Sequence, residues 1–471
     1  MISKIFKAYD VRATYPDLLN ADAAWKVGHA TATFLQRSRE GAAQKVRREG
    51  TMVVGRDMRP HSPELAGALI DGIRSTGMGV IDVGMIDTSC IYFAINLFDC
   101  VGGIQTTASH NPVNYNGFKI SGPQAKPIGA ASGLKDIERI AAQLTRPAST
   151  GKTGGYEEAD IWPDYRKHVL GFLDLKRPVR VAVDASNGMA GVMVPKVFGG
   201  VDNLVIDEIL FEVTGSFVHE PNPLVEANLA MLKQHIREGK AEQAGLNIEA
   251  GCCFDGDADR CIFTDEDGNA IGCDILTALL ARNFLEQPGN QGAAIVYDLR
   301  SSHVVPEEIS AAGGVPVRDR VGHAFIKKTM AEKNAVFGGE LSGHFYFRDN
   351  FFADSGAIAF ARLLSVLSSQ DKPLSALINP LKRFAHSGEV NFRVEEKDAA
   401  IRQLADRNKR YQIDYLDGIT VDAGEEGWWF NVRKSNTEPM LRLNLEARDR
   451  TVLERKFAEM KSLLGEPAEG H

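Results

Sequence analysis

The sequence predicts an α/β protein made of three similar mixed α/β domains and a smaller C-terminal α+β domain. Three apolar stretches have the composition of buried strands and end in an acidic or polar turn, at residues 51–57, 179–188 and 293–302. A helical segment follows each stretch, and a second strand then begins after a glycine. Strand–helix–strand is the unit of a helix-covered parallel sheet, because parallel strands need a long crossover connection. Its recurrence along the chain indicates a repeated domain.

The remaining elements follow in chain order. We expect helices at 62–76, 190–198 and 303–312, and second strands at 77–84, 203–209 and 313–320. From about Ser387 the pattern changes to alternating strands, a charged helix near 396–411 and a final helix at 450–464. The Pro/Gly/Ser/Thr-rich segment 145–155 is typical of a linker. The predicted domains are therefore 1–155, 156–268, 269–379 and 380–471.

Length, charge and cysteine content restrict the class of protein. At 471 residues, with 44% apolar and 25% charged residues, the chain has the composition of a multidomain soluble protein. A formal net charge of −8 argues against nucleic acid as a partner, because a phosphate backbone needs a basic face, but leaves a small anionic substrate open. We find no signal-peptide core, no apolar run that could span a bilayer and no zinc spacing among the six cysteines. We therefore expect a cytoplasmic protein with reduced cysteines and no membrane partner.

The segment FDGDADR places Asp255, Asp257 and Asp259 at alternate positions between two apolar runs. Three carboxylates this close repel one another, and a divalent cation relieves the repulsion. An EF-hand is disfavoured, because Arg260 stands where that loop needs glycine and the flanks resemble strands rather than helices. An aspartate nucleophile of the phosphatase type and a solvated acidic hairpin stay open as alternatives. All-oxygen ligands in a short loop favour Mg²⁺.

The segment TTASHNPVNYNGFKI puts Ser109 and His110 between glycine- and asparagine-rich turns, with Lys119 ten residues after the serine. Ser109 either carries out covalent chemistry or is an ordinary loop hydroxyl. Consecutive side chains usually point apart, so we expect His110 to be a poor base for Ser109. No serine of the chain fits the G-x-S-x-G pattern of a hydrolase nucleophile elbow.

The segment VRKSNTEPMLR brings polar and cationic side chains together near the C-terminal end: Arg433, Lys434, Ser435, Asn436 and Thr437. A guanidinium, hydroxyls, an amide and turn N–H groups are the donors that bind a phosphate dianion. A capped polar turn is the ordinary alternative.

The segment GGELSGHFYF sets Glu340, Ser342 and His344 at alternating positions between glycines. Carboxylate and hydroxyl groups on such a loop suit a polyhydroxyl ligand such as a sugar, because each makes directional hydrogen bonds. The alternative is a tight loop that leads into a strand, with a structural histidine.

Together these segments favour phosphoryl transfer. Ser109 would carry a phosphoryl group while a cation held by the three aspartates neutralises charge on its oxygens. Glu340 and Ser342 would hold sugar hydroxyls, and residues 433–437 would bind the other phosphate of the substrate. Catalysis of this kind depends on positioning and electrostatics.

The combination resembles the α-D-phosphohexomutase superfamily, and most closely its bacterial phosphomannomutase and phosphomannomutase/phosphoglucomutase members. The resemblance covers essentially the whole chain and depends on four motifs in family order: TASHNP with YNGFK, DGDADR, GELSGH and RKSNTEP. It implies three similar α/β domains and a smaller C-terminal domain around a central cleft. The implied reaction interconverts mannose 1-phosphate and mannose 6-phosphate, with glucose phosphates as further candidates, through a hexose 1,6-bisphosphate that also serves as activator. A monomer is compatible with such a cleft.

The resemblance also implies roles for individual residues. Ser109 is similar to the family phosphoserine, which together with Asp255, Asp257 and Asp259 holds Mg²⁺. Arg12 and Lys119 match family residues beside the reacting phosphoryl group, and Arg260 matches a substrate-binding residue near the metal loop. His344 matches a residue near the sugar, and His344 or Lys119 is the implied proton shuttle. The implied substrate contacts are His323 near the sugar, Glu340 and Ser342 on its hydroxyls, and a phosphate clamp of Arg433, Ser435, Asn436 and Thr437.

Three other functions stay open. A phosphoglucomutase-dominant member would use the same motifs, because mannose and glucose differ only at C2. A sugar-phosphate phosphohydrolase would pass the phosphoryl group to water and release free phosphate. A binding protein without transfer activity would keep the cleft, although all four motifs retain their reactive side chains.

Overall fold

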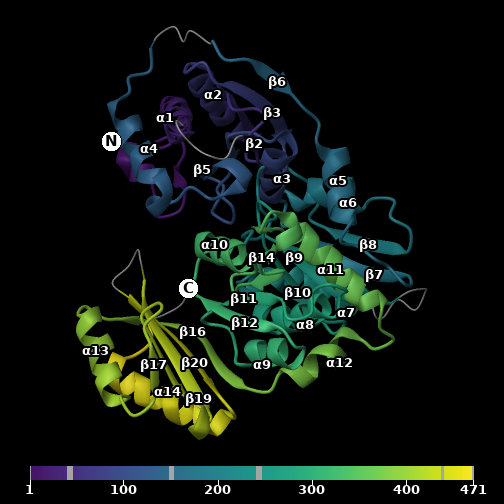
Figure 1. The fold of residues 1–471 in the computed structure, drawn as a ribbon. Helices are drawn as coiled ribbons and strands as arrows, with labels where there is room; N and C mark the ends of the chain where they lie inside the picture. The colour runs from purple at the N-terminus through teal and green to yellow at the C-terminus, as the bar shows by residue number, and fades with distance from the viewer. Residues whose placement is uncertain (1, 40–45, 148–152, 240–246, 436–439, 469–471) are drawn as a thin grey trace. The chain divides into compact units, whose positions relative to one another are not determined.

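The computed structural model describes residues 2–39, 46–147, 153–239, 247–435 and 440–468. They form two compact units. The first unit contains residues 1–271 and 342–375, and the second contains residues 272–341 and 376–471. Figure 1 labels the helices and strands along the chain. Among the described residues, none of the helices has both the length and the apolar character that crossing a membrane requires.

The first sheet of unit 1 has the strand order β1-β5-β4-β2-β3-β6. The strands β2, β3, β4 and β6 run parallel, whereas β5 is antiparallel to β1 and β4. Both faces of β2 are buried, as expected for a parallel sheet covered by helices. The strands are β1 (Val11–Thr14), β2 (Thr51–Arg56), β3 (Gly79–Met85), β4 (Gly103–Thr106), β5 (Tyr115–Ser121) and β6 (Tyr156–Glu158). The α-helices are α1 (Ala21–Arg39), α2 (Ser62–Arg74), α3 (Thr88–Phe98) and α4 (Lys135–Gln143).

The second sheet of unit 1 has the order β10-β9-β7-β8. Here β7 pairs in parallel with β8 and β9, and β10 is antiparallel to β9. The strands are β7 (Val179–Asp184), β8 (Leu204–Ile209), β9 (Ile248–Phe254) and β10 (Cys261–Thr264). The α-helices are α5 (Trp162–Leu170), α6 (Ala190–Phe198) and α7 (Ala230–Gly239). Unit 1 also contains the antiparallel pair β14 (Phe345–Phe347) and β15 (Ala353–Asp354), followed by α11 (Gly356–Ser368).

Unit 2 contains a group of three parallel strands and a separate antiparallel sheet. The strand β11 (Ala294–Asp298) pairs in parallel with β12 (Val315–Asp319) and β13 (Phe337–Gly339). The accompanying helices are α8 (Cys273–Leu285), α9 (Val304–Ala311) and α10 (His323–Lys333). A short helix, α12 (Leu374–Ile378), precedes the C-terminal part.

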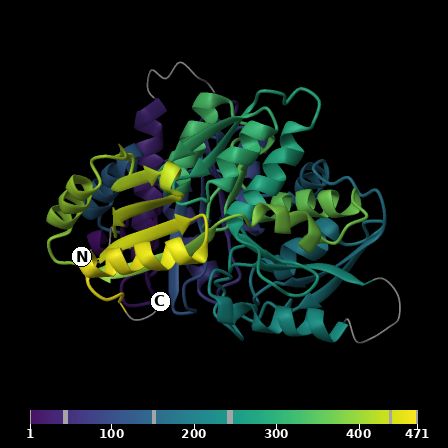
Figure 2. The ribbon, with the colours of Figure 1, turned by 90° about the horizontal axis from the view of Figure 1, so that it is seen from below.

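The C-terminal sheet is antiparallel throughout, in the order β16-β20-β19-β18-β17. Apolar side chains of its strands and helices form one core, in which α14 contributes Leu453 and Met460. Figure 2 shows α14 along one face of this sheet. The elements are β16 (Ala385–Arg393), α13 (Lys397–Arg407), β17 (Gln412–Asp414), β18 (Ile419–Ala423), β19 (Trp428–Lys434), β20 (Met440–Ala447) and α14 (Arg450–Leu464).

The same strand topology occurs three times. The first strand of each repeat (β2, β7 or β11) lies between the second (β3, β8 or β12) and the third (β4, β9 or β13), and all three run parallel. In each repeat the third strand runs into a polar loop, at residues 107–114, 255–260 and 340–344. These loops are the TASHNP, DGDADR and GELSGH motifs, so the repeat gives the three motifs equivalent places in their domains.

The structure confirms the predicted fold class. The predicted helices correspond to α2, α6 and α9, and the final helix was predicted at the residues that form α14. Several strands were not predicted, among them β6, which extends the first sheet beyond the boundary placed at residue 155. All residues of β6 are exposed, and Tyr-Glu-Glu carries no apolar alternation that would reveal a strand.

Candidate active site

Ser109 lies in the loop between β4 and β5, at the end of the first sheet. Its side chain is buried, and its φ of +51° lies in the left-handed region that few residues other than glycine adopt. Ser109 Oγ donates a hydrogen bond to Asp255 Oδ2 at 2.8 Å. The Ser109 N–H donates to Thr107 Oγ1 at 2.9 Å. The loop therefore presents its hydroxyl to the acidic loop of the second sheet.

The acidic loop joins two antiparallel strands, β9 and β10. Asp255, Asp257 and Asp259 are all buried, and one carboxylate oxygen of each lies within 4.8 Å of the others. Asp255 Oδ2 accepts a hydrogen bond from Arg260 Nε at 3.0 Å. Burial raises the pKa of Asp255 to about 7; the Arg260 guanidinium opposes this shift, and the two neighbouring carboxylates add to it. The loop thus concentrates negative charge where little water reaches it.

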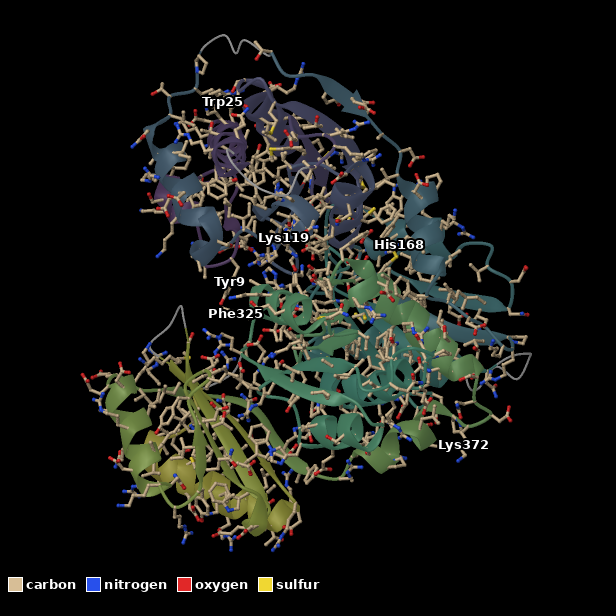
Figure 3. The ribbon with its side chains drawn as sticks, viewed as in Figure 1. Tyr9, Trp25, Lys119, His168, Phe325 and Lys372 are labelled. Carbon is tan, nitrogen blue, oxygen red and sulfur yellow. The ribbon has the colours of Figure 1, made fainter. Side chains whose placement is uncertain are left out.

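Lys119 on β5 is the nearest cation to two of these carboxylates. Its Nζ donates to Asp257 Oδ2 at 2.7 Å and also to Asp259 Oδ2. Burial alone would lower the pKa of Lys119, but the surrounding aspartates outweigh it and raise the pKa above its ordinary value. Lys119, labelled in Figure 3, is therefore held as a cation between the first and second sheets of unit 1.

The acidic loop fits a divalent cation. Asp257 Oδ1 and Asp259 Oδ1 are buried, and within the described parts of the chain neither accepts a hydrogen bond. A buried carboxylate oxygen that accepts no hydrogen bond is costly, and a cation bound between the aspartates would bind both atoms. Oxygen-only donors favour Mg²⁺, Mn²⁺ or Ca²⁺ over softer metals. The three aspartates are thus a candidate metal centre, with Ser109 Oγ in contact with one of them.

His110 differs from the sequence expectation. Its Nδ1 lies 3.3 Å from Ser109 Oγ, so the two neighbouring side chains face each other instead of pointing apart. The expectation that the two side chains point apart was wrong, because alternation holds for extended backbone, whereas Ser109 has a left-handed conformation. Burial and three nearby cations lower the pKa of His110 to about 2, so its imidazole is neutral.

Arg12 reaches the serine loop from β1, which pairs with β5. Its Nη1 donates to Asn111 Oδ1 at 2.6 Å, and its Nη2 is paired with Asp10. Arg12 therefore adds positive charge at the edge of the loop that carries Ser109.

The second half of the GELSGH motif belongs to unit 1 and lies beside the acidic loop. His344 Nδ1 is 2.8 Å from Ser342 Oγ. His344 Nε2 lies 3.6 Å from Asp259 Oδ1 and 3.9 Å from Asp354 Oδ2. Unit 1 thus brings Ser342 and His344 together with the predicted metal ligands.

The first half of the motif belongs to unit 2. Glu340 is 2% exposed, and its Oε1 accepts a hydrogen bond from Gly322 N at 2.9 Å. Gly322 is the N-cap of α10, whose first residue is His323. The next residue of the motif is fixed as well, because Asp298 Oδ2 accepts from Leu341 N at 2.7 Å. The Glu340 carboxylate is therefore hydrogen-bonded to the backbone at the start of α10.

Arg433 lies on β19 within a cluster of arginines around one carboxylate. It donates to Glu389 Oε2, Arg442 Nη1 donates to Glu389 Oε1 at 2.9 Å, and Arg300 Nη1 lies 3.6 Å from Glu389 Oε2. Burial opposes ionisation of Glu389, but the arginines hold its pKa below the ordinary value. Three guanidinium groups around one carboxylate form a positively charged feature suited to a dianion.

The other predicted clamp residues follow Arg433 along the chain. Ser435 is buried, and its N–H donates to Met440 O at 2.9 Å. Asn436 and Thr437 lie outside the described residues.

Arg59 and Glu389 are two of the charged contact residues that were not predicted from the sequence. Arg59 donates to Ser109 O at 2.8 Å, and Glu389 is the carboxylate at the centre of the arginine cluster. The signal for Arg59 was present, because GRDMR sets charged side chains directly after the buried strand β2. Glu389 had no comparable signal, since its importance comes from arginines far away in the sequence.

Four family models match the chain, each describing one domain of phosphoglucomutase/phosphomannomutase. Alpha/beta/alpha domains I, II and III match residues 3–147, 163–268 and 273–384, and the C-terminal domain matches residues 389–463. Together they account for most of the sequence.

Known relatives are similar over nearly the full length. Phosphohexose mutases of Xanthomonas campestris pv. campestris (strain B100) are 37% identical, covering 98% of this chain and 98% of the relative. The phosphomannomutase of Escherichia coli (strain K12) is 36% identical, covering 98% and 99%. The crystal structure of a phosphoglucomutase/phosphomannomutase family protein from Burkholderia thailandensis has a TM-score of 0.85 at 32% identity, covering 98% and 96%. The chain belongs to the phosphoglucomutase/phosphomannomutase family.

Proposed function

We propose that the chain is a phosphohexose mutase that interconverts mannose 1-phosphate and mannose 6-phosphate, with glucose phosphates as second substrates. The observation that carries the proposal is the buried Ser109 hydroxyl, 2.8 Å from a carboxylate of the acidic loop. That loop also binds Lys119, so a nucleophile, a metal-binding set and a cation meet in one place. Relatives named phosphohexose mutases and phosphomannomutase support this reaction class.

The reaction consists of two phosphoryl transfers. In the first, the C6 hydroxyl oxygen of a hexose 1-phosphate bonds to the phosphorus on phosphorylated Ser109, the bond from phosphorus to Oγ breaks, and the hydroxyl proton passes to a base. In the second, the 1,6-bisphosphate presents its C1 phosphate, Ser109 Oγ takes that phosphoryl group, and the C1 oxygen gains a proton. The product is hexose 6-phosphate and the serine is phosphorylated again. Free hexose 1,6-bisphosphate would act as activator by restoring a lost phosphoserine.

The side chains around Ser109 suit different parts of this reaction. Lys119 is cationic in its carboxylate environment, so it is placed to stabilise negative charge. His344 offers an imidazole beside the acidic loop and is the better candidate to accept the hydroxyl proton. Arg12 and Arg260 add positive charge around the serine loop and the acidic loop.

We propose Mg²⁺ as the cation, held by Asp255, Asp257 and Asp259 together with an oxygen on Ser109. When bound, it supplies positive charge that offsets the charge on the oxygens of the transferring phosphoryl group. Aspartates confined to a short loop suit Mg²⁺, which binds through few protein oxygens and keeps water or phosphate as its other ligands.

Substrate recognition is proposed for the loops of the third and fourth domains. Glu340 and Ser342 would hold sugar hydroxyls, with His323 nearby on α10. Arg433, Ser435, Asn436 and Thr437 would bind the phosphate that is not being transferred. Such a site has to accept the bisphosphate in both orientations, which requires a phosphate clamp separate from the transfer centre.

Turnover measured side by side on mannose 1-phosphate, glucose 1-phosphate and glucosamine 1-phosphate, with bisphosphate activator, tests the proposal. We expect conversion of the mannose substrate and slower or equal conversion of the glucose substrate. A strong preference for glucose would make the chain a phosphoglucomutase. Release of free phosphate instead of an isomer would make it a phosphohydrolase, and no turnover of any sugar phosphate would contradict the proposal.

Replacing Arg433 by glutamine is expected to lower kcat/KM about tenfold to a hundredfold, chiefly by raising KM. A charge-assisted hydrogen bond to a dianion contributes about 1.5–3 kcal/mol, which corresponds to that range. Steady-state kinetics on the preferred substrate measures the effect. Arg450→Gln is the matched control, because Arg450 pairs only with the exposed Glu454 among the described ion pairs. An unchanged KM would exclude Arg433 from the phosphate clamp.

A further inference from the structure

The loop that carries Ser109 has an unusual backbone. The left-handed φ of +51° at Ser109 costs about 1–3 kcal/mol for a residue with a side chain, and it persists only when surrounding contacts hold it. The Ser109 carbonyl oxygen is closely approached by the acidic loop, because a Cβ on Gly256 would lie 2.4 Å from it. The acidic loop therefore packs against the backbone of Ser109 as well as contacting its hydroxyl.

Arg59 makes several of the hydrogen bonds that hold this loop. Its Nη2 donates to Ser109 O at 2.8 Å and to Asn111 O at 2.7 Å. Its Nη1 donates to Pro112 O at 2.7 Å and to Tyr115 O at 3.1 Å. One guanidinium thus binds four carbonyl oxygens of the same loop, from the serine to the first residue of β5.

Arg59 is itself anchored in the first sheet. Its side chain is 0% exposed and forms an ion pair with Asp57, at 3.2 Å between Nε and Oδ2. Asp57 Oδ1 accepts from the Arg59 N–H and from the Ser62 hydroxyl at the start of α2. The ring of Phe217 lies over the guanidinium at 5.3 Å. Asp57 follows β2, and its N–H donates to Thr106 O at the end of β4, so the anchor is joined to the strand that leads into the serine loop.

A buried arginine is expensive unless its charge and its donors are all used. Here the charge is balanced by Asp57, and the terminal nitrogens are used by carbonyl groups of one catalytic loop. Because the side chain has no exposed surface, Arg59 is not placed to touch a sugar phosphate. Any effect on turnover would therefore act through the loop.

We propose that Arg59 is a positioning residue for phosphoryl transfer: it holds the strained backbone of Ser109 so that Oγ keeps its direction toward the acidic loop. The inference rests on the proposed mutase function. Ser109 gains and loses a phosphoryl group in every turnover, so the negative charge on its side chain changes each time. Four hydrogen bonds to the loop backbone keep the nucleophile in place in both states.

The proposal depends on the planar guanidinium of Arg59, whose two terminal nitrogens each bind two carbonyl oxygens. A lysine at position 59 keeps the positive charge next to Asp57, but its single ammonium cannot reach two pairs of carbonyl oxygens in the planar geometry that arginine offers. Arg59→Lys therefore separates positioning from charge. Asp57→Asn is a second variant, which keeps Arg59 and loosens its anchor.

The experiment compares Arg59→Lys with Arg177→Lys. Arg177 is a matched control, because it also binds a carboxylate (Glu249) and backbone carbonyls (Leu367 and Gln370), none of them in the candidate site. For each protein we would measure kcat, KM, the thermal midpoint and amide hydrogen exchange of residues 107–116. For Arg59→Lys we expect kcat to fall about tenfold to a hundredfold with KM nearly constant, since a nucleophile displaced by about 1 Å loses rate of this size. Exchange should accelerate in residues 107–116 only, and Asp57→Asn should show a smaller change of the same kind.

Three results would overturn the proposal. The first is unchanged amide hydrogen exchange in residues 107–116. The second is a loss of kcat that only follows the unfolded fraction of the protein and is recovered on cooling. An equal loss in Arg177→Lys also overturns it. If the wild-type protein turned over no hexose phosphate, the proposed function would fail, but the exchange data would still show whether Arg59 holds the loop.

Discussion

Replacing Ser109 by alanine is expected to lower mutase turnover by at least about a thousandfold, as removal of a covalent nucleophile does in other enzymes. The hydroxyl oxygen carries the phosphoryl group between the two half-reactions, and neither neighbouring residue, Ala108 or His110, offers another hydroxyl. The protein should still fold, because the variant loses only the hydroxyl contacts with Asp255 and His110, each worth about 1 kcal/mol. Coupled turnover assays and the thermal midpoint together measure the effect.

Ser121→Ala is the control for this substitution. Ser121 is a buried serine at the end of β5, in the same hairpin, but outside the candidate site. It should retain turnover close to wild type. If Ser109→Ala also kept wild-type turnover, the phosphoryl group would have to be carried elsewhere, and the covalent mechanism would be wrong.

Removing divalent cations is expected to abolish turnover, with full recovery in Mg²⁺ and partial recovery in Mn²⁺. Without a cation the buried carboxylates of Asp255, Asp257 and Asp259 repel one another. Because the cation binds the folded state, Mg²⁺ at a hundred times its Kd should stabilise the protein by about 2.7 kcal/mol. The thermal midpoint therefore reports binding independently of activity.

Asp257→Asn should lose both the activity and the Mg²⁺-dependent rise in thermal midpoint. Its Oδ1 is one of the buried oxygens that accept no hydrogen bond from the described residues. Asp267→Asn is the control, because Asp267 is an exposed carboxylate in the turn after β10. Indifference of the wild-type protein to chelator in both measurements would show that the acidic loop does not work through a metal.

The repeated strand pattern made the fold predictable. Apolar runs such as 51–57 and 179–188 are buried on both faces, so their composition identifies them without knowledge of their neighbours. The polar loops that follow the third strand of each repeat were also visible, because reactive side chains stand among glycines there. Both features are local in the sequence, and local features are the ones that a single sequence reveals.

Contacts set by backbone conformation or by distant residues could not be predicted in this way. The approach of His110 to Ser109 depends on a left-handed φ that a non-glycine residue rarely adopts. The Glu389 carboxylate is bound by Arg433 and Arg442, which lie on two other strands. Arg59 could be seen as a charged residue after a strand, but the four carbonyls that it binds emerge only when the hairpin is folded.

The central claim is that Ser109 passes its phosphoryl group to a hexose phosphate, and a single-turnover experiment tests it most directly. Protein carrying an isotopically labelled phosphoryl group on Ser109 would be mixed with unlabelled mannose 1-phosphate, and the label followed through the first turnover. The account predicts that the label leaves the serine and enters mannose 1,6-bisphosphate and then mannose 6-phosphate. Label that appears as inorganic phosphate, or stays on the protein while isomer forms, would contradict it.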